Sequence, residues 1–156
     1  MRTKSGYKLF CLMSITLPML FVTGCSSNGG SNSVDALITK VATLTGIQEV
    51  PAVTNTTATG SGRFVVDPKT RVISGSVTTK DLTGTVAHIH TGVVGVSGPP
   101  VVMLAETTTG SGVWEVPAGT VLSIANYELF LNGGLYVNVH SSANPKGEIR
   151  GQISSQ

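Results

Sequence analysis

Charged and aromatic side chains are scarce in this sequence. Asp, Glu, Lys and Arg make up 12% of the 156 residues, and Phe, Trp and Tyr make up 5%. The chain is instead rich in valine and threonine, and it holds 19 glycines. Because β-branched residues favour strands and glycines favour tight turns, this composition predicts one all-β domain. It argues against a helical bundle or a disordered tail.

Cysteine occurs only twice, at Cys11 and Cys25, and both positions fall in a predicted targeting signal. A basic start is followed by an apolar stretch at residues 9–22, which is short for a membrane span of roughly 20 residues. The stretch ends in Val22-Thr23-Gly24-Cys25, which resembles a bacterial lipobox. We therefore expect a signal peptide at residues 1–24 and a lipid such as palmitate on Cys25. A simple cleaved signal and an uncleaved anchor are the alternatives.

Lipidation at Cys25 would leave a mature domain without cysteine, and hence without disulfides or thiolate chemistry. Removing the three basic residues of the signal leaves seven Lys and Arg against eight acids, a net charge near −1. No cluster of basic residues with interleaved aromatics is present, so the sequence argues against nucleic-acid binding.

Residues 25–36 are predicted to be the lipidated Cys25 and a flexible tether rich in Gly, Ser and Asn, which precede a domain at residues 37–156. Such a tether holds a domain away from a membrane surface. Ser26, rather than an Asp, follows the cysteine. By analogy with known lipoproteins, this favours the outer membrane in a Gram-negative cell.

Short stretches with strand-like composition recur along the domain and alternate with turn signals. The stretch at 101–105 is apolar on both faces and is expected to be a central, well-covered strand. One short helix is expected at residues 123–131, with Ser123 as its cap and Asn132-Gly133-Gly134 at its end. The predicted strands are residues 38–44, 62–66, 71–79, 85–90, 101–105, 112–116, 135–140 and 148–154.

All three histidines of the chain lie in two of these strands, Ala87-His88-Ile89-His90-Thr91-Gly92 and Leu135-Tyr136-Val137-Asn138-Val139-His140. Side chains alternate faces along a strand, so the aliphatic residues share one face and the three histidines stand on the other. His88, His90 and His140 are therefore candidate ligands for copper, zinc or a similar ion. The alternative is that they make ordinary hydrogen bonds to loops and turns.

The last predicted hairpin adds a candidate partner for this cluster. In its second strand Glu148, Arg150 and Gln152 are expected on the same face as His140. A carboxylate beside an imidazole fixes its tautomer and raises its basicity, so Glu148 is a candidate supporting residue for the metal site. The alternative is a surface ion pair between Glu148 and Arg150, worth roughly 0–1 kcal/mol.

Five motifs follow one another along the domain: Gln48-Glu49-Val50-Pro51, Ala87-His88-Ile89-His90-Thr91-Gly92, Gly98-Pro99-Pro100-Val101-Val102, Leu135-Tyr136-Val137-Asn138-Val139-His140 and Gly147-Glu148-Ile149-Arg150-Gly151-Gln152. Together they resemble the CHRD domain, the module named after chordin, over roughly residues 40–153. The resemblance implies an antiparallel Greek-key β-sandwich used outside the cytoplasm, and it implies a fold more firmly than a function. The Cys-rich repeats that bind growth factors in chordin are absent, so its signalling role does not transfer.

A weaker likeness concerns chemistry. The placement of His88, His90 and His140 is similar to that of three copper ligands on the outside of the sandwich in copper/zinc superoxide dismutases. This sequence lacks the fourth, bridging histidine, the zinc-binding loop of His and Asp, and the disulfide. The likeness therefore implies copper binding rather than dismutase activity.

Taken together, the sequence predicts an exported, lipid-anchored binding or interaction module without catalysis. Its expected partners are a membrane, through Cys25, and an extracytoplasmic protein or polysaccharide. The second hypothesis is a copper-binding or zinc-binding protein that uses the three histidines. A hydrolase or dismutase-like enzyme ranks third, because no Gly-x-Ser-x-Gly elbow and no phosphate-binding loop is present.

Overall fold

A computed structural model describes residues 36–155. The predicted signal peptide (1–24) and Cys25 lie outside the described residues, as does the tether (25–36) except for its last residue. Within the described part no helix is long and apolar enough to cross a membrane.

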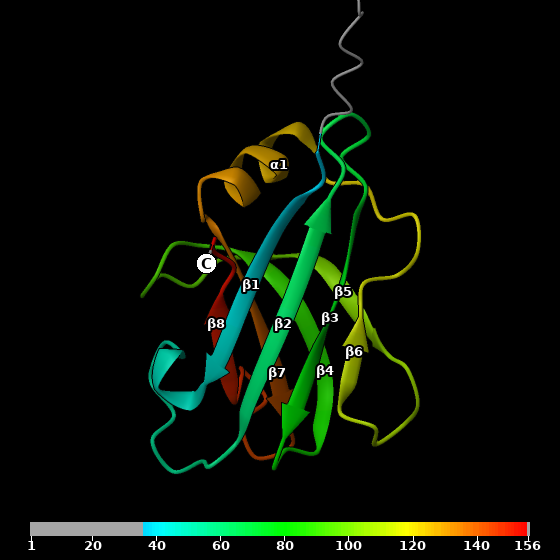
Figure 1. Cartoon of the computed structure of the whole chain (residues 1–156). Helices are drawn as coiled ribbons and strands as arrows, with labels where there is room; N and C mark the ends of the chain where they lie inside the picture. Colours follow the sequence, from blue (N-terminus) through cyan, green and yellow to red (C-terminus); the bar gives the residue numbers. More distant parts are fainter. Residues whose placement is uncertain (1–35, 156) are drawn as a thin grey trace, which may run out of the picture. The chain divides into compact units, whose positions relative to one another are not determined.

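The described chain is all-β with one short helix, as predicted (Figure 1). A short 3-10 turn, η1 (Gly46–Gln48), follows the first strand, and the helix α1 spans Ile124–Leu131. The strands are β1 (Ile38–Thr45), β2 (Thr59–Val66), β3 (Ile73–Lys80), β4 (Gly84–Thr91), β5 (Pro100–Glu106), β6 (Val113–Glu115), β7 (Leu135–Ser141) and β8 (Ile149–Gln152).

All neighbouring strands pair antiparallel in one sheet with the order β1-β2-β3-β6-β5-β4-β7-β8, which closes into a barrel. Closure is sparse: β1 meets β8 at the pair Thr45 and Arg150, and a further bridge joins Val41 to Ser154. The expected two-sheet Greek-key sandwich is not confirmed in that detail, because the pairing continues around the whole sheet. Short sequence motifs carry no signal for such long-range closure.

Most strands were located correctly, but their ends differ from the prediction. The hairpin of β2 and β3 turns where expected, and the carboxylate of Asp67 accepts hydrogen bonds from the backbone N–H groups of Lys69 (2.8 Å) and Thr70 (3.3 Å). Arg71 has a φ of +59°, which belongs to the turn. The strand therefore begins at Ile73 and not at the predicted residue 71.

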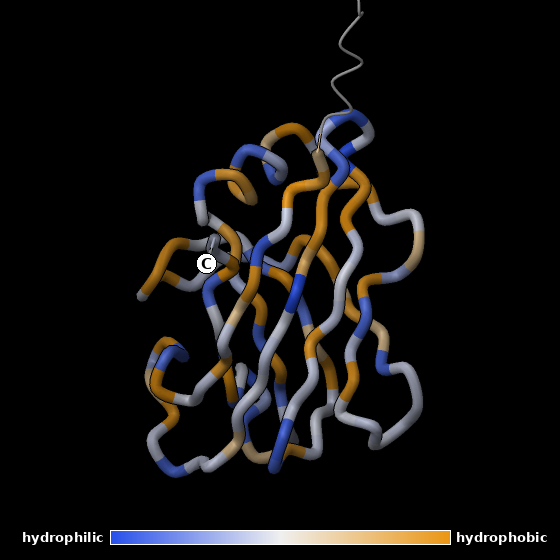
Figure 2. Tube along the Cα trace, viewed as in Figure 1, coloured by the Kyte–Doolittle hydropathy of each residue, from blue (hydrophilic) through white to orange (hydrophobic). Residues whose placement is uncertain are grey.

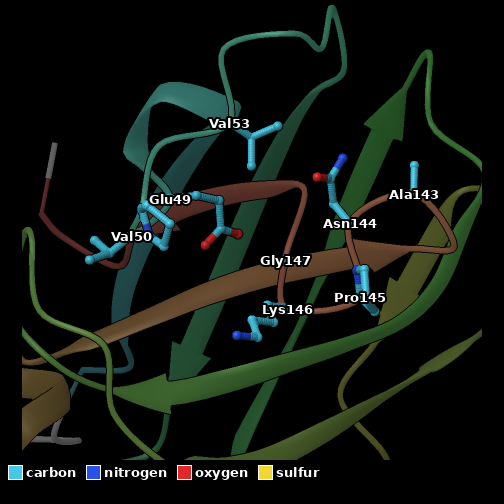
Figure 3. A pocket seen from close by; sticks show the side chains of 9 residues that line it. Glu49, Val50, Val53, Ala143, Asn144, Pro145, Lys146 and Gly147 are labelled. Carbon is cyan, nitrogen blue, oxygen red and sulfur yellow. The ribbon is translucent and has the colours of Figure 1, made fainter.

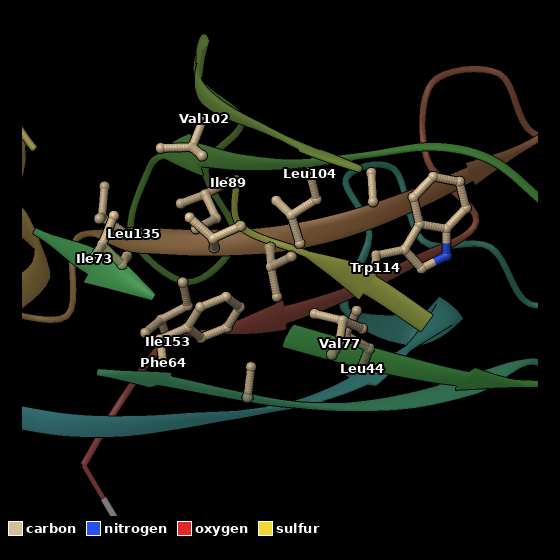
Figure 4. Close-up of a cluster of buried hydrophobic side chains, with 14 of the residues drawn as sticks. Leu44, Phe64, Ile73, Val77, Ile89, Val102, Leu104, Trp114, Leu135 and Ile153 are labelled. Atoms are coloured by element: carbon tan, nitrogen blue, oxygen red, sulfur yellow. The ribbon is translucent and has the colours of Figure 1, made fainter. Parts of the chain in front are cut away.

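The barrel interior is filled by the aliphatic faces that the alternation predicted (Figure 4). Ala87 and Ile89 of β4 and the three aliphatic residues of β7 are fully buried, and Trp114 is buried at 4% exposure. In Figure 2 apolar and polar stretches alternate along the strands.

The prediction that residues 101–105 form a strand covered on both faces is wrong. In β5 Val102 and Leu104 are buried in the core and Val101 is partly buried against it, whereas Met103 is 65% exposed. Among residues 36–155 no second layer covers Met103, so this hydrophobic side chain is exposed to solvent.

Helix α1 has the predicted cap. The Ser123 hydroxyl accepts a hydrogen bond from the backbone N–H of Asn126 at 3.1 Å. Gly133 after the helix has a φ of +72°, and the N–H of Gly134 donates to the carbonyl of Leu129 at 2.8 Å. This is the left-handed helix ending that glycine favours.

Candidate metal centre

The three histidines lie on the outer face of β4 and β7, two hydrogen-bonded neighbours of the barrel. In the register of this pair His88 stands opposite Asn138, His90 opposite Tyr136, and Val86 opposite His140. His140 is therefore the diagonal neighbour of His88 across the two strands. The expected separation of the aliphatic and histidine faces is confirmed for both strands.

The ring nitrogens of the three histidines converge. One potential ligand atom from each of His88, His90 and His140 lies within 4.8 Å of the others. The shortest approach joins Nδ1 of His88 to Nε2 of His140 at 3.3 Å. An ion bound at about 2.0–2.1 Å from each nitrogen places its ligands up to about 4 Å apart. The observed separations of up to 4.8 Å exceed this spacing by less than about 1 Å.

Backbone carbonyls fix the tautomers of two of the rings. Nδ1 of His90 faces the carbonyl of Gly98 at 2.9 Å, and Nδ1 of His140 faces the carbonyl of Pro145 at 3.0 Å. A carbonyl only accepts, so each Nδ1 carries the proton and each Nε2 keeps its lone pair. The alternative to a metal site was that the histidines make ordinary hydrogen bonds to loops and turns, and these two bonds are of that kind. They engage only Nδ1 of His90 and Nδ1 of His140.

Nε2 of His90 is buried and has no hydrogen-bond partner among the described residues. A buried polar atom without a partner costs free energy, so such an atom calls for an explanation. A metal ion placed among the three rings would satisfy it.

The surroundings of His88 and His90 disfavour protonation of these two rings by lowering their pKa. Burial, followed by the nearby charges of His140 and His90, lowers the pKa of His88. Burial is also the main cause that lowers the pKa of His90, and it outweighs the opposite effect of the bond to Gly98. Because a metal ion needs the unprotonated ring, protons compete less for this site.

An aromatic and a cationic side chain stack beside His90. The ring of Tyr136 lies parallel to that of His90, with centroids 4.9 Å apart and an interplanar angle of 10°. The guanidinium of Arg150 lies 3.5 Å from the centroid of Tyr136. The three side chains form a continuous stack from the histidine cluster to β8.

Arg150 also holds the loop that orients His90. Its Nη2 donates to the carbonyls of Val93 (2.9 Å) and Val96 (3.0 Å), in the loop that supplies the Gly98 carbonyl. At 2% exposure Arg150 is nearly inaccessible to solvent. The predicted polar face of β7 is thus buried beneath loops. Strand alternation predicted that Arg150 of β8 points the same way as the polar residues of β7. It gave no sign that Arg150 is buried or that it contacts the loop.

Glu148 does not take the role expected of it. Its carboxylate accepts a hydrogen bond from Thr56 at 2.6 Å, while both ring nitrogens of His140 face other groups. The carbonyl of Pro145 orients His140 in its place. The expected surface pair with Arg150 is not seen either, because Arg150 is buried and turned toward the loop carbonyls. Glu148 directly precedes the last strand, and in this irregular segment strict alternation fails.

A pocket of about 310 Å³ lies beside the histidine cluster and is lined in part by a buried carboxylate (Figure 3). Glu49 is 8% exposed, and its Oε1 has no hydrogen-bond partner among the described residues. Burial raises the pKa of Glu49, while the nearby Arg150 opposes that rise. Pro145, which orients His140, forms part of the pocket wall. The sequence marked Glu49 only as part of a family motif and gave no sign of its burial.

Comparison with known proteins agrees with the motif resemblance. A family model described as the CHRD domain matches residues 40–153. No curated protein and no solved structure gives a significant match.

Proposed function

Because the chain belongs to the CHRD-domain family, we propose that it is an exported, lipid-anchored binding module whose ligand is a transition-metal ion. The ion is copper in the first place and zinc in the second. The anchor is the lipid on Cys25, and the site of action is the cell envelope, at the outer membrane in a Gram-negative cell. The protein binds its ligand without catalysis.

One observation carries the metal proposal: three imidazoles offer ligand atoms within 4.8 Å of one another. The unpartnered Nε2 of His90 and the carbonyl bonds that set the tautomers of His90 and His140 support it. A metal site commonly fixes its histidines by such bonds to the second ring nitrogen.

The ligand type favours copper or zinc over hard cations. Imidazole nitrogen suits Cu, Zn, Fe and Ni, whereas Ca²⁺ and Mg²⁺ need oxygen ligands. Among the described residues no carboxylate joins the three-histidine cluster. We therefore expect no calcium-binding or magnesium-binding role at this position.

The family match favours a second candidate function, an interaction module for an extracytoplasmic protein or polysaccharide. The two functions differ in what the histidines contribute. An interaction module would tolerate their replacement, whereas a metal-binding protein would lose its ligand.

The test is titration of the full chain, purified in detergent, with copper and with zinc. A variant with His88, His90 and His140 all changed to Ala is measured beside it. We expect the wild type to bind one ion at micromolar or tighter affinity and the variant to bind none tightly. Equal weak binding by both proteins would refute the metal function and favour the interaction module.

A further inference from the structure

We propose that the three-histidine site discriminates by ionic charge and holds Cu(I) in preference to Cu(II) and Zn(II). This inference rests on the proposed function and adds the oxidation state of the bound ion. It follows from the charge, burial and number of the ligands.

The ligand set brings no negative charge to the ion. His88, His90 and His140 are neutral ligands, and the described residues add no carboxylate to the cluster. The nearby Glu148 is hydrogen-bonded to Thr56. A divalent ion would keep its full double charge in this site, whereas Cu(I) would keep a single charge. The free-energy cost of removing an ion from water rises steeply with the magnitude of its charge. The site therefore favours the monovalent ion.

The cluster provides three nitrogen ligands, and its burial leaves little room for water as a further ligand. His90 and His140 are each only 9% exposed, and His88 is partly buried. Zn²⁺ takes four ligands in most protein sites, and Cu(II) prefers a tetragonal arrangement. Cu(I) is stable with two or three ligands, so it alone of the three ions is satisfied by the histidines without a further group.

Arg150 adds a fixed positive charge at the end of the stack that begins at His90. Its guanidinium remains charged at all physiological pH values. It lies 3.5 Å from the ring centroid of Tyr136, whose ring lies 4.9 Å from that of His90. The fixed positive charge of Arg150 repels a divalent ion at the three histidines more strongly than it repels a monovalent ion.

The test compares three affinities of the full chain in detergent. Cu(I) affinity is measured anaerobically by competition with bicinchoninate, and Cu(II) and Zn(II) affinities by competition with nitrilotriacetate. We expect the dissociation constant for Cu(I) to be at least about 100-fold lower than that for Cu(II). For a one-electron couple each tenfold difference between the two dissociation constants shifts the reduction potential by about 59 mV. The reduction potential of bound copper would therefore lie about 120 mV above that of the free ions.

Two failures are distinguishable. If Cu(II) or Zn(II) binds as tightly as Cu(I), the charge preference is refuted while the metal function stands. If none of the three ions binds more tightly to the wild type than to the triple-alanine variant, the proposed function fails and this inference fails with it.

Variants of two arginines test the contribution of fixed charge. Arg150→Met removes the charge beside Tyr136, and Arg63→Met removes an equal charge from an exposed position on β2. We expect Arg150→Met to reduce the Cu(I) to Cu(II) affinity ratio about tenfold and Arg63→Met to leave it unchanged. A displaced loop would weaken both oxidation states alike, so the ratio separates charge from structure. An unchanged ratio in Arg150→Met would show that its charge plays no part.

Discussion

A methyl group added at Gly147 should disturb the buried carboxylate and the histidine site together. Gly147 has a φ of +132°, and a Cβ there would lie closer than 3.0 Å to Oε1 of Glu49 and Nδ2 of Asn138. Both of these side chains are buried, at 8% and 2% exposure. Neither can therefore yield without rearrangement of its surroundings.

Two costs add up in Gly147→Ala. An unfavourable φ for a residue other than glycine costs about 1–3 kcal/mol, and overpacking of a filled site costs about 1–3 kcal/mol. We expect the free energy of unfolding to fall by about 2–6 kcal/mol. Gly119→Ala is the matched control, because Gly119 has a φ of +77° and no atom lies within 4 Å of its added Cβ. The control should lose only the left-handed backbone cost of about 1–2 kcal/mol.

Urea unfolding of the full chain in the absence of metal measures both variants. Equal losses for Gly147→Ala and Gly119→Ala, within about 0.5 kcal/mol, would refute the packing argument. A second comparison isolates the clash: in a Glu49→Ala background the loss from Gly147→Ala should shrink by about 1 kcal/mol. The loop of Gly147 also carries Pro145, which orients His140. We therefore expect copper to bind about 10–100-fold more weakly to Gly147→Ala.

Two further predictions concern pH and the anchor. The folded-state pKa values of His88 and His90 lie below their ordinary value of 6.5. The unfolded chain therefore takes up protons first, and the free energy of unfolding of the metal-free protein should decrease as pH falls below 6.5. Urea titrations between pH 5 and 8 should show a weaker decrease in a His88→Ala, His90→Ala variant, and an identical decrease would contradict this origin. Cys25→Ala should abolish labelling with radioactive palmitate and shift the protein from the membrane to the soluble fraction. Undiminished labelling would place the lipid elsewhere.

Alternation of polar and apolar residues was sufficient to predict which face of β4 and β7 enters the core. Ala87, Ile89 and Val137 face inward because period two is a property of the extended backbone itself. The same parity placed the three histidines on one face. Local chemistry likewise sufficed for the Asp67 turn and the Ser123 cap, since their hydrogen bonds involve residues only two or three positions apart.

The same pattern failed where solvent exposure depends on distant segments. Met103 was expected to be covered but is exposed, because no second layer packs over that part of the described barrel. Arg150 reads as a surface cation but is buried beneath the loop that contains Val93 and Val96. Glu148 was expected beside His140 and instead hydrogen-bonds to Thr56, far away in the sequence.

Composition and short-range pattern were enough to predict that this protein is all-β, that it carries the CHRD motifs, and that its histidines share one face of the sheet. These properties depend on composition, on local order and on the two-residue period of a strand. Three features became apparent only from the fold: the sheet closes, loops bury the histidine face, and the carbonyls of Gly98 and Pro145 set the tautomers. The fold also placed the charge of Arg150 next to Tyr136. These features depend on contacts between segments far apart in the chain, and nothing in the local pattern of residues encodes such contacts.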